Sequence, residues 1–335
     1  MSKGDDIPIE IVREGVRLWE EGKMHEANSD NREAIACYHK MNELVFPDPP
    51  VLNRIAFCHL MLKEVDKAKE TLRQSLDIDP YDEEALHNLS LLLIEHGELQ
   101  EAEDLTRRGI ALETNLSGHW KNLGEIMYKR GKYTEAIVAL ATSIGLAPDK
   151  YEAHHTLALA YIRVSDFENA EREFLRAIEL WDENAELLCD YALVFFVMDR
   201  HKDAEQYLRR AVEVEPLSTI SHYMLAECLV VQVMEAKDDY DADIVEEILE
   251  ILNQTLSLDV ECGQAWYLWG KMMVMFRKWE DAERYLRAGT EHGAINPEAW
   301  SLHSAALAEL GRHEEAEEVF QEFKERERNM PGYGT

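Results

Sequence analysis

The sequence predicts an all-α fold built from antiparallel helix pairs, and two observations support that prediction. Apolar residues recur every three or four positions, the spacing of one face of a helix, and strand-like alternation is absent. An alanine also recurs every 34 residues along most of the chain. A fixed interval of this length indicates one supersecondary unit repeated many times. The alanines at this interval are Ala34, Ala68, Ala102, Ala136, Ala170 and Ala204, followed later by Ala282 and Ala316.

The clearest unit is 117–150, which reads SGHWKNLGEIMYKRGKYTEAIVALATSIGLAPDK. In its first half, Trp120 and Gly124 lie on one face of an expected helix. Gly131 interrupts the pattern, which then resumes and ends before Pro148. The unit therefore predicts a helix, a tight turn and a second helix.

This unit resembles the tetratricopeptide repeat, whose signature is W-x2-L-G-x2-Y, then Ala, an aromatic or large apolar residue four positions on, and then Pro. It departs at Met127, where the family has Tyr, and at Leu140, where it has Phe. The resemblance covers 8–330 and implies a right-handed superhelical solenoid of antiparallel helix pairs, with tails at 1–7 and 331–335. The nine expected repeats are 8–48, 49–82, 83–116, 117–150, 151–184, 185–218, 219–262, 263–296 and 297–330.

The seventh repeat is longer than the others because of an acidic insertion around 233–243. Asp239, Asp241, Asp243 and Glu250 fall at the first, third, fifth and twelfth positions of an EF-hand calcium loop. However, Ile244 occupies the sixth position, where that loop needs Gly for a sharp turn. We therefore favour a solvated or helix-capping acidic loop over a calcium site.

Composition restricts the partners and the compartment. The 35 basic residues against 67 acidic ones give a net charge of −32, which argues against nucleic acid and anionic membranes. No segment approaches the roughly 20 apolar residues of a membrane helix, and the first residues do not resemble an export signal. The five cysteines are scattered, and no His or Cys has another three or four positions away. We expect a soluble cytoplasmic protein with reduced thiols and with neither a metal nor a cofactor.

The resemblance also implies where a ligand binds, because the first helices of such repeats line the concave side of the superhelix. Carrying the family's contact positions over gives a set of expected peptide-binding residues. These are Asn53, Arg54, His87, Asn88, Lys121, Asn122, Tyr128, Lys129, His155, Arg163, Phe196, Tyr223 and Tyr267.

The N-terminal half of this set predicts the chemistry of the ligand. Asn88 and Asn122 resemble the asparagine ladder by which some relatives hold a peptide backbone, although both could be ordinary solvated residues. Lys121, Lys129 and Arg163 are cations at groove positions of an acidic protein. They predict a peptide that is acidic or ends in a free carboxylate.

The C-terminal repeats are more apolar. In the eighth repeat, Trp266 and Trp269 fall at core positions, which leaves Tyr267 and Met275 as the expected exposed members. In the ninth, Phe320 and Phe323 have no following repeat to cover them. Either the charged run KERER lays its stems over them, or this end docks against another copy or a partner.

No phosphate-binding glycine loop, nucleophile elbow or other catalytic motif is present. We therefore expect a non-catalytic scaffold or adaptor that binds a peptide segment of a partner protein. The alternative is a regulatory or substrate-recruiting subunit of an enzyme complex that docks a folded partner through its apolar C-terminal half.

Overall fold

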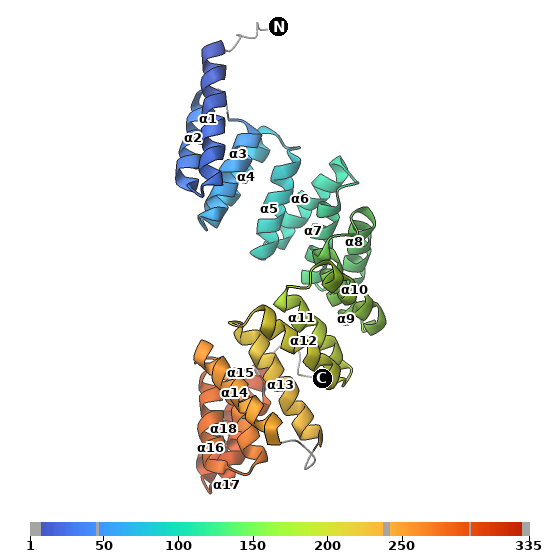
Figure 1. Ribbon diagram of the computed structural model, residues 1–335, viewed down its shortest axis with the longest axis vertical. Coiled ribbons are helices and arrows are strands. Elements are labelled where there is room, and N and C mark those ends of the chain that lie inside the picture. The colour runs from blue at the N-terminus through green and yellow to red at the C-terminus, as the bar shows by residue number, and fades with distance from the viewer. Residues whose placement is uncertain (1–7, 45–46, 237–241, 295, 330–335) are drawn as a thin grey trace. The chain divides into compact units, whose positions relative to one another are not determined.

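The computed structural model describes residues 8–44, 47–236, 242–294 and 296–329 (Figure 1). These residues form eighteen α-helices, and no strand occurs among them. The helices up to Leu180 are α1 (Ile9–Ala27), α2 (Asn31–Leu44), α3 (Pro49–Met61), α4 (Val65–Ile78), α5 (Glu83–Glu95), α6 (Leu99–Leu112), α7 (Ser117–Lys129), α8 (Tyr133–Leu146), α9 (Tyr151–Arg163) and α10 (Phe167–Leu180). The remaining helices are α11 (Ala185–Val197), α12 (His201–Val214), α13 (Thr219–Ala236), α14 (Ala242–Leu258), α15 (Gly263–Met275), α16 (Trp279–Glu291), α17 (Glu298–Glu309) and α18 (His313–Asn329).

Consecutive helices lie side by side, as Figure 1 shows for α1 with α2 and for α7 with α8. The all-helical fold of consecutive pairs predicted from the sequence is confirmed. Each pair falls inside one of the nine predicted repeat spans. The chain divides into two compact units, Met1–Glu173 (unit 1) and Phe174–Thr335 (unit 2), and the division falls inside α10.

Small residues set how closely the two helices of a pair approach. The alanines at the 34-residue interval from Ala34 to Ala282 are completely buried, and Ile248, which takes their place in the seventh repeat, is buried too. Opposite them, a Cβ on Gly124 would lie 2.4 Å from Leu140, and one on Gly270 would lie 2.4 Å from Leu286. Neither glycine can gain a side chain unless the pair separates.

In every pair whose turn lies among the described residues, that turn contains one residue with a left-handed backbone. Gly97, Gly131 and Gly311 supply it at φ of 75°, 74° and 77°. Lys63 and Asp199 adopt φ of 59° and 54° at the equivalent places, so glycine is not required at every turn. The sequence predicted these turns where it contained Gly and only by position where it did not.

The seventh repeat has two long helices, α13 and α14. Part of the acidic insertion, residues 237–241 with Asp239 and Asp241, lies outside the described residues. Asp243 and Ile244 lie in the first turn of α14. The position where a calcium loop would turn sharply is therefore helical, which agrees with the sequence argument against calcium.

At the C-terminal end, α18 continues through the charged run that follows Phe323. Phe320 and Phe323 stack with ring centroids 6.0 Å apart and are half-buried. Lys324 covers Phe320, with its Nζ 4.4 Å from the ring centroid. The stem of Lys324, which belongs to the charged run KERER, thus lies over Phe320, as in the first of the two alternatives given above.

We predict that Ala136→Glu destabilises unit 1 by about 3 kcal/mol or more, because Ala136 is completely buried and the change adds both bulk and an unpaired charge. Val138→Glu on the same helix is the matched control, since Val138 is 66% exposed. Thermal unfolding followed by circular dichroism measures both. Equal melting temperatures for the two variants would contradict the helix register in which Ala136 faces α7.

Candidate binding groove

Asn53 is buried and links α3 to the residue that caps α5. Its Nδ2 donates to Asp82 Oδ2 over 2.9 Å. Asp82 is the N-cap of α5, and the same oxygen also accepts from Ser75 Oγ over 2.7 Å. Asn53 therefore ties α3 to the N-cap of α5 through its Nδ2, while its buried Oδ1 has no hydrogen-bond partner among the described residues, and the residue, which is 3% exposed, presents little to a ligand.

Arg54 makes an equivalent link to the preceding repeat. Its guanidinium forms a two-bond ion pair with Glu26, whose side chain is only 6% exposed. Tyr38 donates its hydroxyl hydrogen to Glu26 Oε1 over 2.6 Å, and burial raises the pKa of this phenol above its usual value. Arg54 therefore neutralises a buried carboxylate rather than facing a partner with a free charge.

Asn122 is completely buried, so it cannot serve as a rung of an asparagine ladder. Its Nδ2 donates to Ser90 Oγ over 2.9 Å and lies 3.4 Å from His87 Nδ1. Asn88 is half-buried on α5. The expected pairing of Asn88 with Asn122 along a peptide is therefore wrong, because α7 turns Asn122 toward α5.

His87 and His119 lie together beside Asn122, with ring centroids 5.6 Å apart in an edge-on arrangement. Burial, and then the neighbouring His119 and Lys121, lower the pKa of His87 to about 4. Burial also lowers the pKa of His119, whose two ring nitrogens have no hydrogen-bond partner among the described residues. Both rings are therefore neutral near pH 7.

The expected cluster of cations also contains a carboxylate, which the prediction from Lys121, Lys129 and Arg163 did not take into account. Glu125 lies between the two lysines of α7, with Lys121 Nζ 3.5 Å from Oε2 and Lys129 Nζ 3.9 Å from Oε1. Lys129 keeps a 42% exposed side chain, while that of Lys121 is 25% exposed. These three residues present one net positive charge rather than two.

Arg163 faces the aromatic residues of the neighbouring pair. Its Nε donates to Tyr133 Oη over 3.0 Å, and its guanidinium lies 5.1 Å from the centre of that ring. Tyr128 in turn lies 5.6 Å from Tyr133, measured between ring centroids. His155 is half-buried on α9. Arg163 is thus held over tyrosines.

In unit 2, the expected exposure of Tyr267 is wrong, because its side chain is buried. Its hydroxyl donates to Glu298 Oε2 over 2.5 Å and accepts from Asn296 Nδ2 over 3.2 Å, and Lys271 Nζ lies 2.8 Å from the same Glu298 oxygen. Tyr267 therefore ties α15 to the start of α17. The sequence offered no direct sign of this, because Glu298 is one of many acidic residues.

Tyr223 and Phe196, the other two aromatic residues expected in unit 2, are half-buried. Burial raises the pKa of Tyr223 above its usual value, with the nearby Glu227 carboxylate adding to the effect. Burial also raises the pKa of Glu227. Phe196 packs edge-on against His201, with ring centroids 5.3 Å apart.

Four apolar side chains are exposed at the ninth and thirteenth positions of the first helix in two repeats. The family resemblance implies ligand contacts at both of these positions. On α3 these are Phe57, 42% exposed, and Met61, 54% exposed. On α11 they are Leu193, 44% exposed, and Val197, 57% exposed. Carrying the family's contact positions over to the sixth repeat also gives Leu193 and Val197, whereas Phe57 and Met61 were not among the expected residues.

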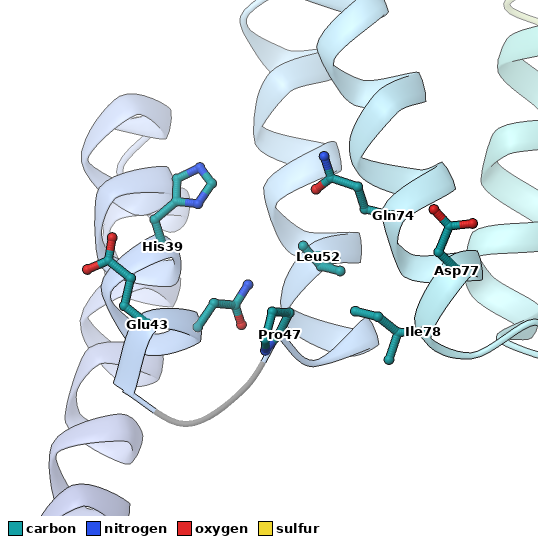
Figure 2. Close-up of a pocket in the computed structure, with 8 residues that line it drawn as sticks. His39, Glu43, Pro47, Leu52, Gln74, Asp77 and Ile78 are labelled. Carbon is teal, nitrogen blue, oxygen red and sulfur yellow. The ribbon is translucent and has the colours of Figure 1, made fainter.

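A separate open cavity of about 450 Å³ lies between α2 and α4 in unit 1. Figure 2 shows His39 and Glu43 on one side of it and Gln74 and Asp77 on the other, with Leu52 between them. None of the expected peptide-binding residues lines this cavity. Its two carboxylates and apolar floor are ordinary for so acidic a surface.

Two family profiles match parts of this chain. A family profile described as cilia and flagella-associated protein 70 C-terminal domain matches residues 43–250, and a tetratricopeptide repeat profile matches residues 276–331. Among the described residues, no helix is long and apolar enough to cross a lipid bilayer.

Several curated proteins are distantly similar. The BBSome complex member BBS4 homolog of Drosophila melanogaster is 25% identical over 193 residues, which cover 47% of this chain and 40% of that protein. BBSome complex member BBS4 of Bos taurus is 23% identical over 209 residues, which cover 61% of this chain and 40% of that protein. A TPR repeat-containing protein of Dictyostelium discoideum is 27% identical over 160 residues, covering 45% and 60%. The chain spans about half the length of the curated relatives it matches.

Two solved structures show the same fold. A tetratricopeptide repeat protein from Parabacteroides merdae matches with a TM-score of 0.55 and 15% identity, over 77% of this chain and 98% of that one. Pseudomonas aeruginosa pilF matches with a TM-score of 0.53 and 18% identity, over 65% and 94%.

The half-buried His87 makes stability depend on pH. Its folded-state pKa is about 4, below its ordinary value of 6.5, so the unfolded chain takes up a proton first as the pH falls. The contribution of the neutral His87 to the free energy of unfolding is fully present above pH 6.5 and is lost as the pH falls toward 4. The loss is about 2 kcal/mol at pH 5. We predict that His87→Gln removes this part of the loss.

Urea unfolding at pH 7 and pH 5 measures the effect, with the exposed His39→Gln as control. The difference in unfolding free energy between the two pH values should shrink for His87→Gln and stay unchanged for His39→Gln. The same difference in both variants would mean that His87 is protonated as easily in the folded protein as in the unfolded chain.

Proposed function

The chain belongs to the tetratricopeptide repeat family, and its residues 43–250 to the family described as cilia and flagella-associated protein 70 C-terminal domain; from this we propose that it is a non-catalytic scaffold for protein–protein interaction. The nine helix pairs of 8–330 serve as one binding array. Polar groups such as Tyr38 and Tyr267 bond to neighbouring helices of the protein, and the sequence contains no catalytic motif. Its site of action is the cytoplasm, in agreement with five free cysteines.

The observation that carries this proposal is the exposure of Leu193 and Val197 on α11. They lie four positions apart and so share one face of the helix. Solvent-exposed aliphatic side chains that are neighbours in this way gain free energy when a partner covers them, by about 25 cal/mol for each Å² of apolar surface removed from water. Phe57 and Met61 occupy the corresponding positions of α3.

The mode of binding that these contacts favour is the docking of a partner protein as part of a larger assembly. At the positions where a repeat would hold an extended peptide, Asn53, Asn122 and Tyr267 are buried and hydrogen-bonded within the protein. The relatives that carry the name BBSome complex member are subunits of a complex by that name, and we propose a comparable subunit role for this chain.

A second mode is the binding of an acidic or C-terminal peptide along α7. It is favoured by the exposed ammonium group of Lys129, close to the aromatic row of Tyr128 and Tyr133. Glu125 weakens this surface but leaves it one net positive charge in a chain of net charge −32. A carboxylate ligand at this surface would compete with Glu125 for the two lysines.

We predict that Leu193→Ser/Val197→Ser weakens binding of the physiological partner by about tenfold or more, because loss of a buried interface side chain commonly costs over 1 kcal/mol. The tagged chain would be purified from its own cell, and co-purifying proteins would be quantified by mass spectrometry. Val138→Ser on α8, also exposed, is the control. A set of proteins that is unchanged in the double variant would exclude α11 as the docking face.

For the peptide mode, we predict that Lys121→Glu/Lys129→Glu abolishes binding of an acidic peptide with a free C-terminus and leaves the circular dichroism spectrum unchanged. Wild-type affinity should also fall between 0.05 and 0.5 M salt, since exposed charge pairs are screened over about 8–10 Å at ordinary ionic strength. Fluorescence anisotropy with a labelled peptide measures both, with Lys132→Glu as control. Equal affinity in the double variant would exclude α7.

A further inference from the structure

Three side chains with different metal-binding atoms meet between α1 and α2, away from the groove. Glu21 and His25 lie one turn apart on α1, and Cys37 lies on α2. One oxygen, one nitrogen and the sulfur of this trio are all within 4.8 Å of one another. Although the chain has 67 acidic residues, this is the single group of its kind within the described residues.

The helix packing around the trio is tight, which fixes where the donors stand. Gly22 follows Glu21 directly, and a Cβ there would lie 2.6 Å from the ring of Tyr38. Tyr38 follows Cys37 and is completely buried, with Trp19 packed at 5.5 Å between ring centroids. The close approach of α1 to α2 therefore places oxygen, nitrogen and sulfur donors on a rigid frame.

The trio is shielded but reachable. Cys37 is 8% exposed, and the side chains of His25 and Glu21 are 24% and 36% exposed. Glu21 and Cys37 also line a cavity of about 530 Å³ that gives an ion access from solvent.

The neighbours of the trio leave each donor able to bind. Arg17 Nη1 donates to Glu21 Oε2 over 3.0 Å, which leaves Oε1 to bind a metal. His25 Nδ1 is buried without a hydrogen-bond partner among the described residues, and Asp30 Oδ2 lies 3.6 Å from it. A carboxylate beside a histidine is the arrangement that orients the ring in many metal sites.

We propose that Glu21, His25 and Cys37 bind one Zn²⁺ ion, with water as the fourth ligand. Sulfur and nitrogen donors favour Zn²⁺ over Mg²⁺ and Ca²⁺, which prefer oxygen. A tetrahedral Zn²⁺ with bonds of about 2.0–2.3 Å needs its ligand atoms roughly 3.5 Å apart. Rotation of the Glu21 and His25 side chains brings their ligand atoms to this distance from Cys37 Sγ. The thiolate and the carboxylate together balance the charge of the ion.

The proposed ion would join α1 to α2 and so stabilise the first repeat. Without metal, burial and the Glu21 carboxylate raise the pKa of the Cys37 thiol, and Lys40 and Arg17 oppose that rise. Binding therefore replaces the thiol proton by the metal. A search for His and Cys three or four positions apart on one helix could not find this trio. Its two members on α1, Glu21 and His25, are four positions apart but include only one His, and Cys37 lies on the next helix.

The test uses the full chain, freed of metal with a chelator and titrated with Co²⁺ and then Zn²⁺ in high salt. We expect one equivalent of Co²⁺ to give the charge-transfer absorption of a cobalt–thiolate bond, and one equivalent of Zn²⁺ to remove it. Zn²⁺ should also raise the melting temperature. Both effects should weaken as the pH is lowered.

Cys37→Ser and His25→Gln should abolish the cobalt–thiolate absorption and weaken Zn²⁺ binding by about tenfold or more. Cys262→Ser is the matched control, because Cys262 is a partly exposed cysteine in the other unit. If Cys37→Ser fails to fold, His25→Gln decides alone, since His25 is partly exposed. The proposal is overturned if wild type shows weak multiple binding without a thiolate absorption, or if His25→Gln keeps the absorption.

Discussion

Each helix pair in this chain can bury its apolar face only against its neighbours, and the rest of the structure depends on that constraint. Within each unit, the described helices that contact each other extensively are adjacent in sequence or are separated by one helix. Close approach inside a pair is set by small residues, such as Ala136 facing α7 and Gly124 facing Leu140. The same close approach at Gly22 brings the oxygen, nitrogen and sulfur atoms of the first repeat together. Packing thus determines both the fold and the placement of its chemical groups.

Contacts between successive repeats use the polar side chains that a related protein would offer to a ligand. Asn53 bonds to Asp82, Arg54 to Glu26, Asn122 to Ser90 and Tyr267 to Glu298. The contacts of Arg54, Asn122 and Tyr267 join one repeat to the next, that of Asn53 joins α3 to the N-cap of α5, and each occupies a polar group with a partner inside the protein. The side chains that stay exposed at groove positions include the apolar ones of α3 and α11, Lys129 of α7 and Arg163 of α9.

The sequence predicted the helices well because their signals are local. The 34-residue spacing of alanines such as Ala68 and Ala102, and the apolar spacing within each unit, depend on residues close together in the chain. Exposure at groove positions could not be predicted in this way. Whether Asn122 or Tyr267 faces outward depends on partners 32 and 31 residues away, in the next or previous repeat. The proposed zinc ligands escaped notice for the same reason, since they come from two helices.

The most direct test of this account is a double-mutant cycle at Asn122 and Ser90, measured as the free energy of unfolding. If their hydrogen bond joins the third repeat to the fourth, Asn122→Ala and Ser90→Ala should each destabilise the protein, and the double variant should lose less than the two single losses together. The account predicts a coupling of about 1 kcal/mol. Losses that add to within about 0.3 kcal/mol would contradict it, because the hydrogen bond between Asn122 and Ser90 would then contribute nothing to joining the two repeats.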